Sequence, residues 1–259
     1  MHRGYNRTRQ LVEFIELSRM FGATHFTLYD YLGNLTVLNP VIREYEKQGL
    51  LELVNWKLAG MVTDHVLNPE EERFVKGFED QCTQVLAHTE CLYRNLHKYK
   101  YIAFYDLDEM LVPGYNRTWP ELVKLIPKNY SSFIFHNRFF PLRNRVKEEL
   151  GKYNDPLLIK YHPVSLEYTL AESEIVFTRP KVMVLGKGVS KCRVHHVVHL
   201  SGSHPFDIPV HLGTMWHYRS RPPKDSKKPA ERDYYMYKFK DELLARMDRI
   251  FQKTRALIV

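Results

Sequence analysis

The segment Tyr101–Pro113, YIAFYDLDEMLVP, decides the fold class and carries the sharpest chemical feature of the chain. Five apolar or aromatic residues, Tyr101–Tyr105, lead into the acidic run DLDE at 106–109, and a second apolar run follows. A short apolar run of this length predicts a buried strand. Ligands of open α/β sheets bind at the carboxyl ends of strands, so the acidic run lies where a ligand is expected.

Upstream of this segment the sequence alternates between helical and extended patterns. We expect helices at Thr8–Phe21, Pro40–Lys47 and Asp80–Lys98, and strands at His25–Tyr29, Leu51–Trp56 and Tyr101–Tyr105. Such alternation predicts a parallel sheet with crossover helices. A fold of this kind normally opens with a strand, whereas this pattern opens with a helix. We therefore expect a further strand upstream of Met1.

Downstream of Pro113 the pattern becomes rich in strands and ends in a polar helix. We expect a helix at Trp119–Ile126, strands at Ser132–His136, Leu157–Tyr161, Lys181–Leu185 and Arg193–Leu200, and a helical stretch at Glu231–Arg255. The sequence predicts one α/β domain over 1–225, with lobes at about 1–115 and 116–225. A C-terminal helical tail over 226–259 completes the chain.

Composition limits the classes of protein to consider. The chain has 259 residues, of which 44% are hydrophobic, enough for one large domain. Its formal charge of +8 suits an anionic partner, but Lys and Arg are spread along the chain, so we expect no nucleic-acid partner. No stretch approaches the roughly 20 apolar residues of a membrane span. Four N-x-[ST] sequons, at Asn6, Asn34, Asn116 and Asn129, point instead to a secretory protein.

The acidic run predicts a divalent metal site. Asp106 and Asp108 are two positions apart, so in an extended chain their side chains lie on the same side. Carboxylate oxygens suit Mg²⁺ or Mn²⁺, which proteins commonly hold with one or two carboxylates plus substrate phosphates. The sequence thus favours a ligand that carries phosphate oxygens, such as a nucleoside diphosphate-sugar.

Several stretches together resemble glycosyltransferase family 92. They are Gly22–Tyr29 (GATHFTLY), Tyr45–Trp56 (YEKQGLLELVNW), Gln84–Asn95 (QVLAHTECLYRN), the acidic run and His217–Arg219 (HYR). The resemblance implies a GT-A fold, which is a Rossmann-like three-layer sandwich, here with a β-rich C-terminal lobe and a C-terminal helix. It also implies transfer of a sugar with inversion, most simply galactose from UDP-galactose with Mn²⁺, onto a glycan or glycoprotein. Animal members are anchored in the Golgi membrane and face the lumen, so we expect membrane association only through a segment absent from this sequence.

Candidate residues follow from this resemblance and from residue type. We assign Asp106 and Asp108 as metal ligands. His217 is assigned as a further ligand that completes the coordination of the metal, with His195 and His196 as alternatives. Arg219 is assigned to bind a phosphate. On the nucleotide side we expect Asp30 and His25. Asp108 is also assigned as a catalytic residue, because it is expected to hold the metal that stabilises the leaving group. For the base that deprotonates the acceptor we favour Glu172 over Glu174 and Asp207.

Two other readings of the acidic run stay open at this point. Haloacid-dehalogenase-like phosphohydrolases also place a D-x-D pair after a strand, with the first Asp as nucleophile. A glycosyltransferase-like domain that binds a glycan or partner without catalysis is the other alternative.

Overall fold

The observed elements follow the sequence pattern closely in the first half of the chain. The computed structural model describes residues 7–30, 35, 38–56, 69–114, 117–142, 155–220, 230–256 and 258. Its first elements are helices α1 (Thr8–Met20), α2 (Asn39–Lys47) and α3 (Pro69–Asn95), and strands β1 (Phe26–Asp30), β2 (Leu51–Asn55) and β3 (Tyr101–Phe104). All six expected elements are confirmed, and α3 begins earlier than its apolar periodicity indicates.

Strands β1 and β2 form a parallel pair in which Phe26 is opposite Leu51, with α2 as the crossover. Between α1 and β1 the chain turns at Gly22, which has a φ of +111°. A Cβ at this position would lie 2.7 Å from the Cδ of Pro120. Both the backbone angle and the close approach therefore require glycine.

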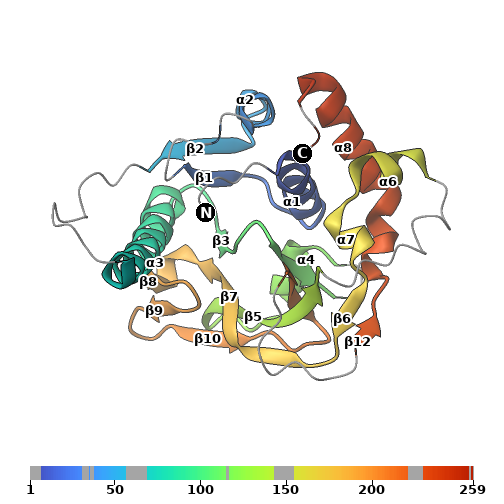
Figure 1. Cartoon of the computed structure of the whole chain (residues 1–259). Coiled ribbons are helices and arrows are strands. Elements are labelled where there is room, and N and C mark those ends of the chain that lie inside the picture. The colour runs from blue at the N-terminus through green and yellow to red at the C-terminus, as the bar shows by residue number, and fades with distance from the viewer. Residues whose placement is uncertain are drawn as a thin grey trace.

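The larger sheet comes mostly from the second half of the chain (Figure 1). Its strand order is β3-β7-β5-β11-β4, and β10 also pairs with β5. The new strands are β4 (Glu109–Pro113), β5 (Tyr130–Pro141), β7 (Ile175–Leu185), β10 (His204–Asp207) and β11 (Gly213–Arg219). β3 pairs antiparallel with β7 and has no ladder to β1 among the described residues. The parallel sheet expected for the first three strands is therefore divided between two sheets.

One expected strand, Leu157–Tyr161, is wrong. The segment is helix α6 (Pro156–Tyr161), which is followed by the short helix α7 (Val164–Glu167). The Asp155 carboxylate accepts hydrogen bonds from the backbone N–H groups of Leu157 and Leu158, and Pro156 occupies the first turn. An apolar run of this length has no periodicity that separates strand from helix. The Asp155 cap and Pro156 therefore determine that the segment forms a helix.

Short strands complete the second half. They are β6 (Leu170–Glu172), β8 (Val189–Cys192), β9 (Val197–His199) and β12 (Ala230–Arg232), and α4 (Trp119–Lys124) precedes β5. Only Val197–His199 of the expected strand Arg193–Leu200 is extended, and the expected strand Ser132–His136 is the middle of the longer β5. No described helix combines the length and apolar character needed to cross a bilayer. Of the sequons, Asn129 is exposed in the turn before β5, and Asn6, Asn34 and Asn116 lie outside the described residues.

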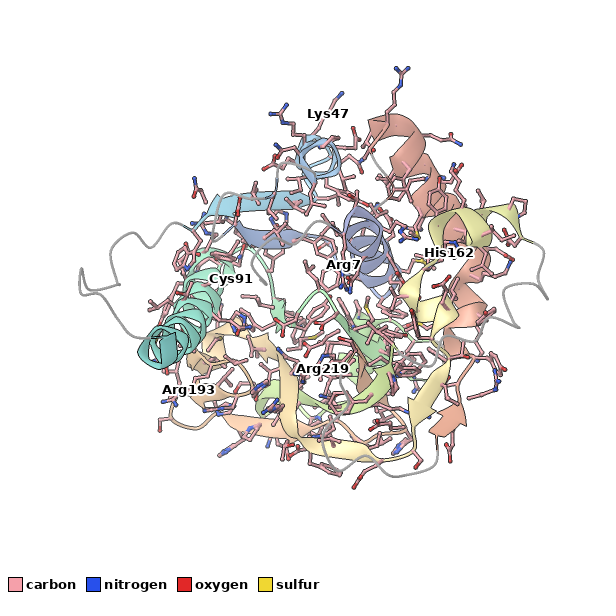
Figure 2. All side chains as sticks on the ribbon, in the orientation of Figure 1. Arg7, Lys47, Cys91, His162, Arg193 and Arg219 are labelled. Atoms are coloured by element: carbon pink, nitrogen blue, oxygen red, sulfur yellow. The ribbon has the colours of Figure 1, made fainter. Side chains whose placement is uncertain are left out.

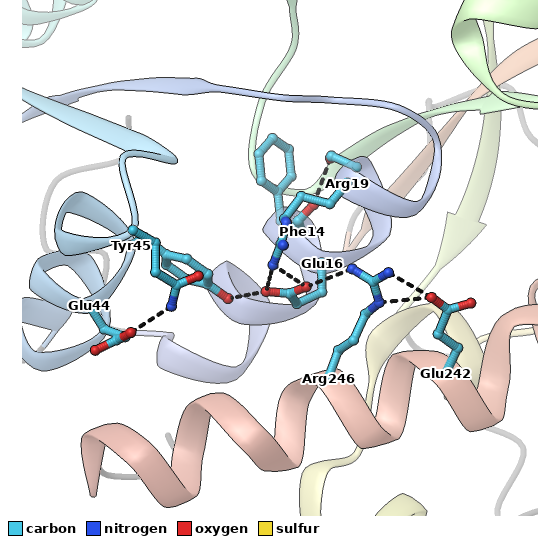
Figure 3. Close-up of polar contacts among 9 residues, drawn as sticks. Phe14, Glu16, Arg19, Glu44, Tyr45, Glu242 and Arg246 are labelled. Atoms are coloured by element: carbon cyan, nitrogen blue, oxygen red, sulfur yellow. Dashed lines mark hydrogen bonds and ion pairs between the residues drawn. The ribbon is translucent and has the colours of Figure 1, made fainter.

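The C-terminal helix α8 (Lys240–Thr254) packs against α1, α2 and α6. Glu16 of α1 is the polar centre of this contact (Figure 3). Its buried carboxylate accepts a hydrogen bond from the Tyr45 hydroxyl at 2.8 Å and lies 2.9 Å from Arg19 and 3.4 Å from Arg246 of α8. Three basic or hydroxyl partners thus offset the cost of burying this carboxylate.

We expect Arg246→Met to lower the free energy of unfolding by about 1–2 kcal/mol, because one cation of a half-buried pair is lost while Arg19 and Tyr45 stay. Arg249→Met, at an exposed position of the same helix, is the matched control. Urea unfolding measures both. Equal effects in the two variants would show that the contact with Glu16 contributes nothing.

Candidate active site

The acidic run forms a tight turn between β3 and β4. The N–H of Glu109 donates to the carbonyl of Asp106 at 3.0 Å, and the N–H of Asp106 donates to the Glu109 carboxylate at 2.9 Å. The turn at Leu107 and Asp108 overturns the expectation of an extended chain with both aspartates on one side. This reversal lets the chain pair β4 with β11, which no local pattern predicts.

Lys181 of β7 offsets the negative charge of two carboxylates of the turn, those of Asp106 and Glu109. Its ammonium lies 2.7 Å from Asp106 and 3.2 Å from Glu109, and its side chain is 1% exposed. The Glu109 side chain is 3% exposed, whereas that of Asp106 is 41% exposed. Gln84 of α3 donates to the other Asp106 oxygen at 3.2 Å. Asp106 is therefore oriented from two sides and only partly exposed, while Glu109 is enclosed.

The charges in this cluster shift one another's pKa values. Burial raises the pKa of Glu109 to about 7, with the Asp106 charge adding to the effect and Lys181 and His217 opposing it. Burial alone would raise the pKa of Asp106, but the charge and hydrogen bond of Lys181 hold it below its usual range. Burial would likewise lower the pKa of Lys181, but the two carboxylates hold it above its usual value. Asp106 and Lys181 are thus the ionised pair of the site.

His217 of β11 lies beside the other side of the cluster, next to Asp108 and Glu109. Antiparallel pairing of β11 with β4 sets His217 opposite Glu109. Its Nε2 lies 3.4 Å from Asp108 and its Nδ1 lies 3.6 Å from Glu109. The N–H of Tyr218 donates to the Asp108 carbonyl at 2.9 Å, which fixes the turn against the strand. The HYR stretch and the acidic run therefore meet, although about 110 positions separate them in the sequence.

The cluster opens into a cavity of about 1200 Å³ that runs past the ends of β1 and β3. Of the predicted site residues, His25, Asp106, Asp108, His217 and Arg219 line it, as does His195. Arg7, before α1, and Arg219, at the end of β11, are labelled in Figure 2. The exposed Arg219 guanidinium is of the type that binds a phosphate.

Other predicted residues are not brought to the cluster. His25 stacks on Tyr99 before β1 begins, at the opposite end of the strand from the acidic turn. Asp30 ends β1 and is absent from the cavity lining. Glu172 lies buried on β6, also away from the lining, so its role as base stays a prediction without support from the geometry.

Two residues of the cluster are missing from the sequence-based assignment. The assignment from sequence names Asp106 and Asp108 but gives Glu109 no role, although Glu109 is the most buried carboxylate of the turn. Lys181 is a single basic residue at one end of an apolar run, KVMVL, and that unusual position is the only local signal it gives. A lysine is rarely buried unless it is paired, so its partner had to be an acidic residue distant in sequence.

Some residues of the cluster are of the type that binds a divalent cation. Asp108 and His217 are adjacent and of suitable chemistry, and the buried Nδ1 of His217 has no hydrogen-bond partner. In the described part of the chain, however, no three acidic, His or Cys side chains converge as a ready-made centre. The residues therefore fit a cation that takes most of its remaining ligands from phosphate oxygens or water, as Mg²⁺ and Mn²⁺ commonly do.

A mixed α/β fold with an acidic cluster at the carboxyl end of a strand and beside a large cavity is compatible with a GT-A-like domain. The chain belongs to glycosyltransferase family 92, because the sequence model of that family matches residues 1–255. This membership contradicts the phosphohydrolase alternative.

Two curated relatives come from Caenorhabditis elegans. The glycosyltransferase family 92 protein ZK381.2 is 26% identical over 204 residues, which is 77% of this chain and 37% of the relative. The glycosyltransferase family 92 protein C33H5.2 is 25% identical over 142 residues, which is 47% of this chain and 27% of the relative. The chain thus spans about a third of the length of these relatives or less.

Proposed function

We propose that this domain transfers a sugar from a nucleoside diphosphate donor to a glycan or glycoprotein acceptor. The observation that carries the proposal is the charged cluster of Asp106, Asp108, Glu109, Lys181 and His217 at the mouth of a cavity large enough for such a donor, in a chain of family 92. UDP-galactose is the proposed donor, with inversion at the anomeric carbon. The proposed location of the full-length protein is the lumenal side of the Golgi membrane.

The proposed roles follow from position. Asp106, Asp108 and His217 would hold Mn²⁺ or Mg²⁺, and the cation would supply Lewis-acid stabilisation of the leaving diphosphate. Lys181 keeps Asp106 ionised and oriented, so that this carboxylate is available as a ligand at neutral pH. Arg219 lines the same cavity, where its guanidinium would contact a phosphate oxygen of the donor. The base is a carboxylate near the acceptor, with Glu172 as the candidate from sequence.

UDP together with Mn²⁺ should raise the melting temperature of the domain, because a ligand that binds only the folded state stabilises it. At a concentration one hundred times Kd the gain is about 2.7 kcal/mol, or roughly 5–10 °C for a domain of this size. UDP without metal should give much less. A shift that is identical with and without Mn²⁺ would contradict the metal site, and turnover of UDP-galactose tests transfer directly.

Asp108→Asn should remove most of this metal-dependent shift while leaving the basal melting temperature within a few degrees, because Asp108 is partly exposed and its contact with His217 is long. We expect at least a ~10-fold weaker Mn²⁺ dependence. Asp241→Asn, at an exposed position on α8, is the matched control. Retention of the full shift in Asp108→Asn would remove Asp108 from the metal site.

A further inference from the structure

Strand β7 leaves the ladder of the large sheet at residues 177–180. The paired positions of β5 advance from 135 to 137 where those of β7 run from 181 to 176, so residues 177–180 lie opposite His136 alone. The described ladder of β3 along the other side of β7 ends at Val182, so this part of β7 forms an edge of the sheet. Figure 1 shows β7 beside β5 and β10 in the lower part of the molecule. We call residues 177–180 the β7 protrusion.

The backbone of the β7 protrusion is strained. Arg179 has a φ of +60°, in the left-handed region that residues other than Gly, Asn and Asp seldom adopt. Residues 177–179 are all exposed, so packing in the core does not account for this conformation. Bulges often lie next to active sites, where they redirect side chains, and backbone strain concentrates at functional sites. The shape of the protrusion therefore indicates a binding role.

Phe177 presents its ring to solvent on a fixed support. The residue is 66% exposed, yet its ring lies 4.5 Å from that of the buried His136, measured between centroids. Nε2 of His136 lies 2.8 Å from a carboxylate oxygen of Asp207 on β10, and this contact orients the imidazole. One side of the Phe177 ring is therefore held by the protein, and the rest is open to an apolar surface of a ligand.

Asp207 supplies hydrogen-bonding capacity beside this ring. Its side chain is 67% exposed, and the contact with His136 occupies only one of its two oxygens. The second oxygen remains an acceptor for a donor group from outside the protein. Because Asp207 and Phe177 contact the same imidazole, a ligand that covers the ring would also bring its polar groups to Asp207.

A pyranose ring has the chemistry that this combination requires. Its C–H groups pack on an aromatic ring, while hydroxyl groups at its edge donate to a carboxylate. A stable protein partner would instead bury a surface of about 800 Å² on each side. Phe177 is a single exposed ring followed by the polar residues Thr178 and Arg179, which favours a small polar ligand with one apolar face.

The β7 protrusion also borders the cavity of the candidate active site. Arg179 lines that cavity, as does Asn137 of β5. Two residues of chain span at most about 7 Å, so Phe177 lies near the rim of the cavity although it is absent from its lining. Nδ1 of His195, another lining residue, lies 3.2 Å from the carbonyl of Pro180 and holds the end of the protrusion. An oligosaccharide on Phe177 can therefore extend past Arg179 into the cavity.

We propose that the β7 protrusion is the acceptor subsite, where Phe177 stacks on a pyranose ring of the glycan and Asp207 accepts hydrogen bonds from its hydroxyl groups. The geometry of the two side chains carries the sugar subsite, and its use for the acceptor rests on the proposed function. Asp207 is absent from the cavity lining, so its role is to bind the acceptor and not to remove its proton.

Saturation-transfer NMR of the full chain tests the subsite. The probes are methyl β-galactoside, methyl β-glucoside and N,N′-diacetylchitobiose at millimolar concentration, and we expect saturation of C–H protons on one pyranose face of at least one of them. Phe177→Ala should weaken this binding about 10-fold, because the stacking contact and the burial of the ring are lost. Phe177→Trp should retain it. Tyr93→Ala removes a ring that is 56% exposed on α3, and this matched control should bind as the wild type does.

Three results would overturn the subsite. The first is the absence of saturation in all three probes with the wild type. The second is equal binding by the wild type and Phe177→Ala, which would place the sugar elsewhere. The third is a wild-type dimer that dissociates in Phe177→Ala, measured by sedimentation, which would assign the ring to contact with a second copy of the chain.

The shift of the melting temperature with UDP and Mn²⁺ is a separate readout. It should be equal in the wild type and Phe177→Ala, because Phe177 does not line the cavity. A normal shift without sugar binding would overturn the subsite and leave the proposed function intact. Sugar binding through Phe177 without any shift would contradict the proposed function, and with it the acceptor role, while the sugar subsite would stand.

Discussion

Lys181→Met is expected to lower the free energy of unfolding by about 3 kcal/mol at pH 8. Removal of one partner from a buried ion pair costs about 3–5 kcal/mol, because the other charge is left uncompensated. The expected loss of stability lies at the lower end of this range for two reasons. The Asp106 side chain is 41% exposed and can be solvated, and Glu109 can take up a proton. Urea unfolding measures the loss.

A compensated variant separates charge from packing. Lys181→Met combined with Asp106→Asn and Glu109→Gln removes all three charges and keeps their shapes, so most of the lost stability should return. The loss in Lys181→Met alone should also be smaller at pH 5, where Glu109 is protonated, than at pH 8. A penalty that is independent of pH and persists in the triple variant would mean that Lys181 acts only through the packing of its hydrocarbon stem.

Glu109→Gln is expected to stabilise the protein at high pH and to leave it unchanged at low pH. The folded-state pKa of Glu109 is raised from 4.5 to about 7. A group with a raised pKa contributes stability that is fully present below pH 4.5 and is lost as the pH rises through 7. Gln mimics the protonated form at every pH. The free energy of unfolding of the variant should therefore rise relative to that of the wild type between pH 4.5 and 7. Above pH 8 the difference should reach roughly 2–3 kcal/mol.

Glu121→Gln provides a control of opposite sign. Hydrogen bonds from the backbone and hydroxyl of Thr118 hold the pKa of Glu121 below its usual value in the capping box of α4. This carboxylate stabilises the fold above its unfolded-state pKa, and the contribution is lost as the pH falls. Glu121→Gln should therefore be less stable than the wild type at neutral pH and equal to it in acid. A Glu109→Gln profile that is flat with pH would contradict the raised pKa.

The sequence determined most of what depends on local pattern. The alternation of helices and strands up to Tyr101–Phe104 is set by apolar periodicity and by breaks such as Gly22, and each of those elements forms where it is expected. The acidic run at 106–109 and the HYR stretch identified the two segments that meet in the candidate site. Short apolar runs were the exception, because the Asp155 cap rather than periodicity made Leu157–Tyr161 a helix.

The tertiary structure decided which segments are neighbours, because hydrogen bonds between strands and ion pairs form across large separations in sequence. β3 pairs with β7 rather than with β1, and that pairing is what brings Lys181 to Asp106 and Glu109. The pairing of β11 with β4 likewise brings His217 to Asp108. A sequence shows where charged residues occur, but the burial that gives Glu109 a pKa near 7 exists only once distant strands exclude water from it.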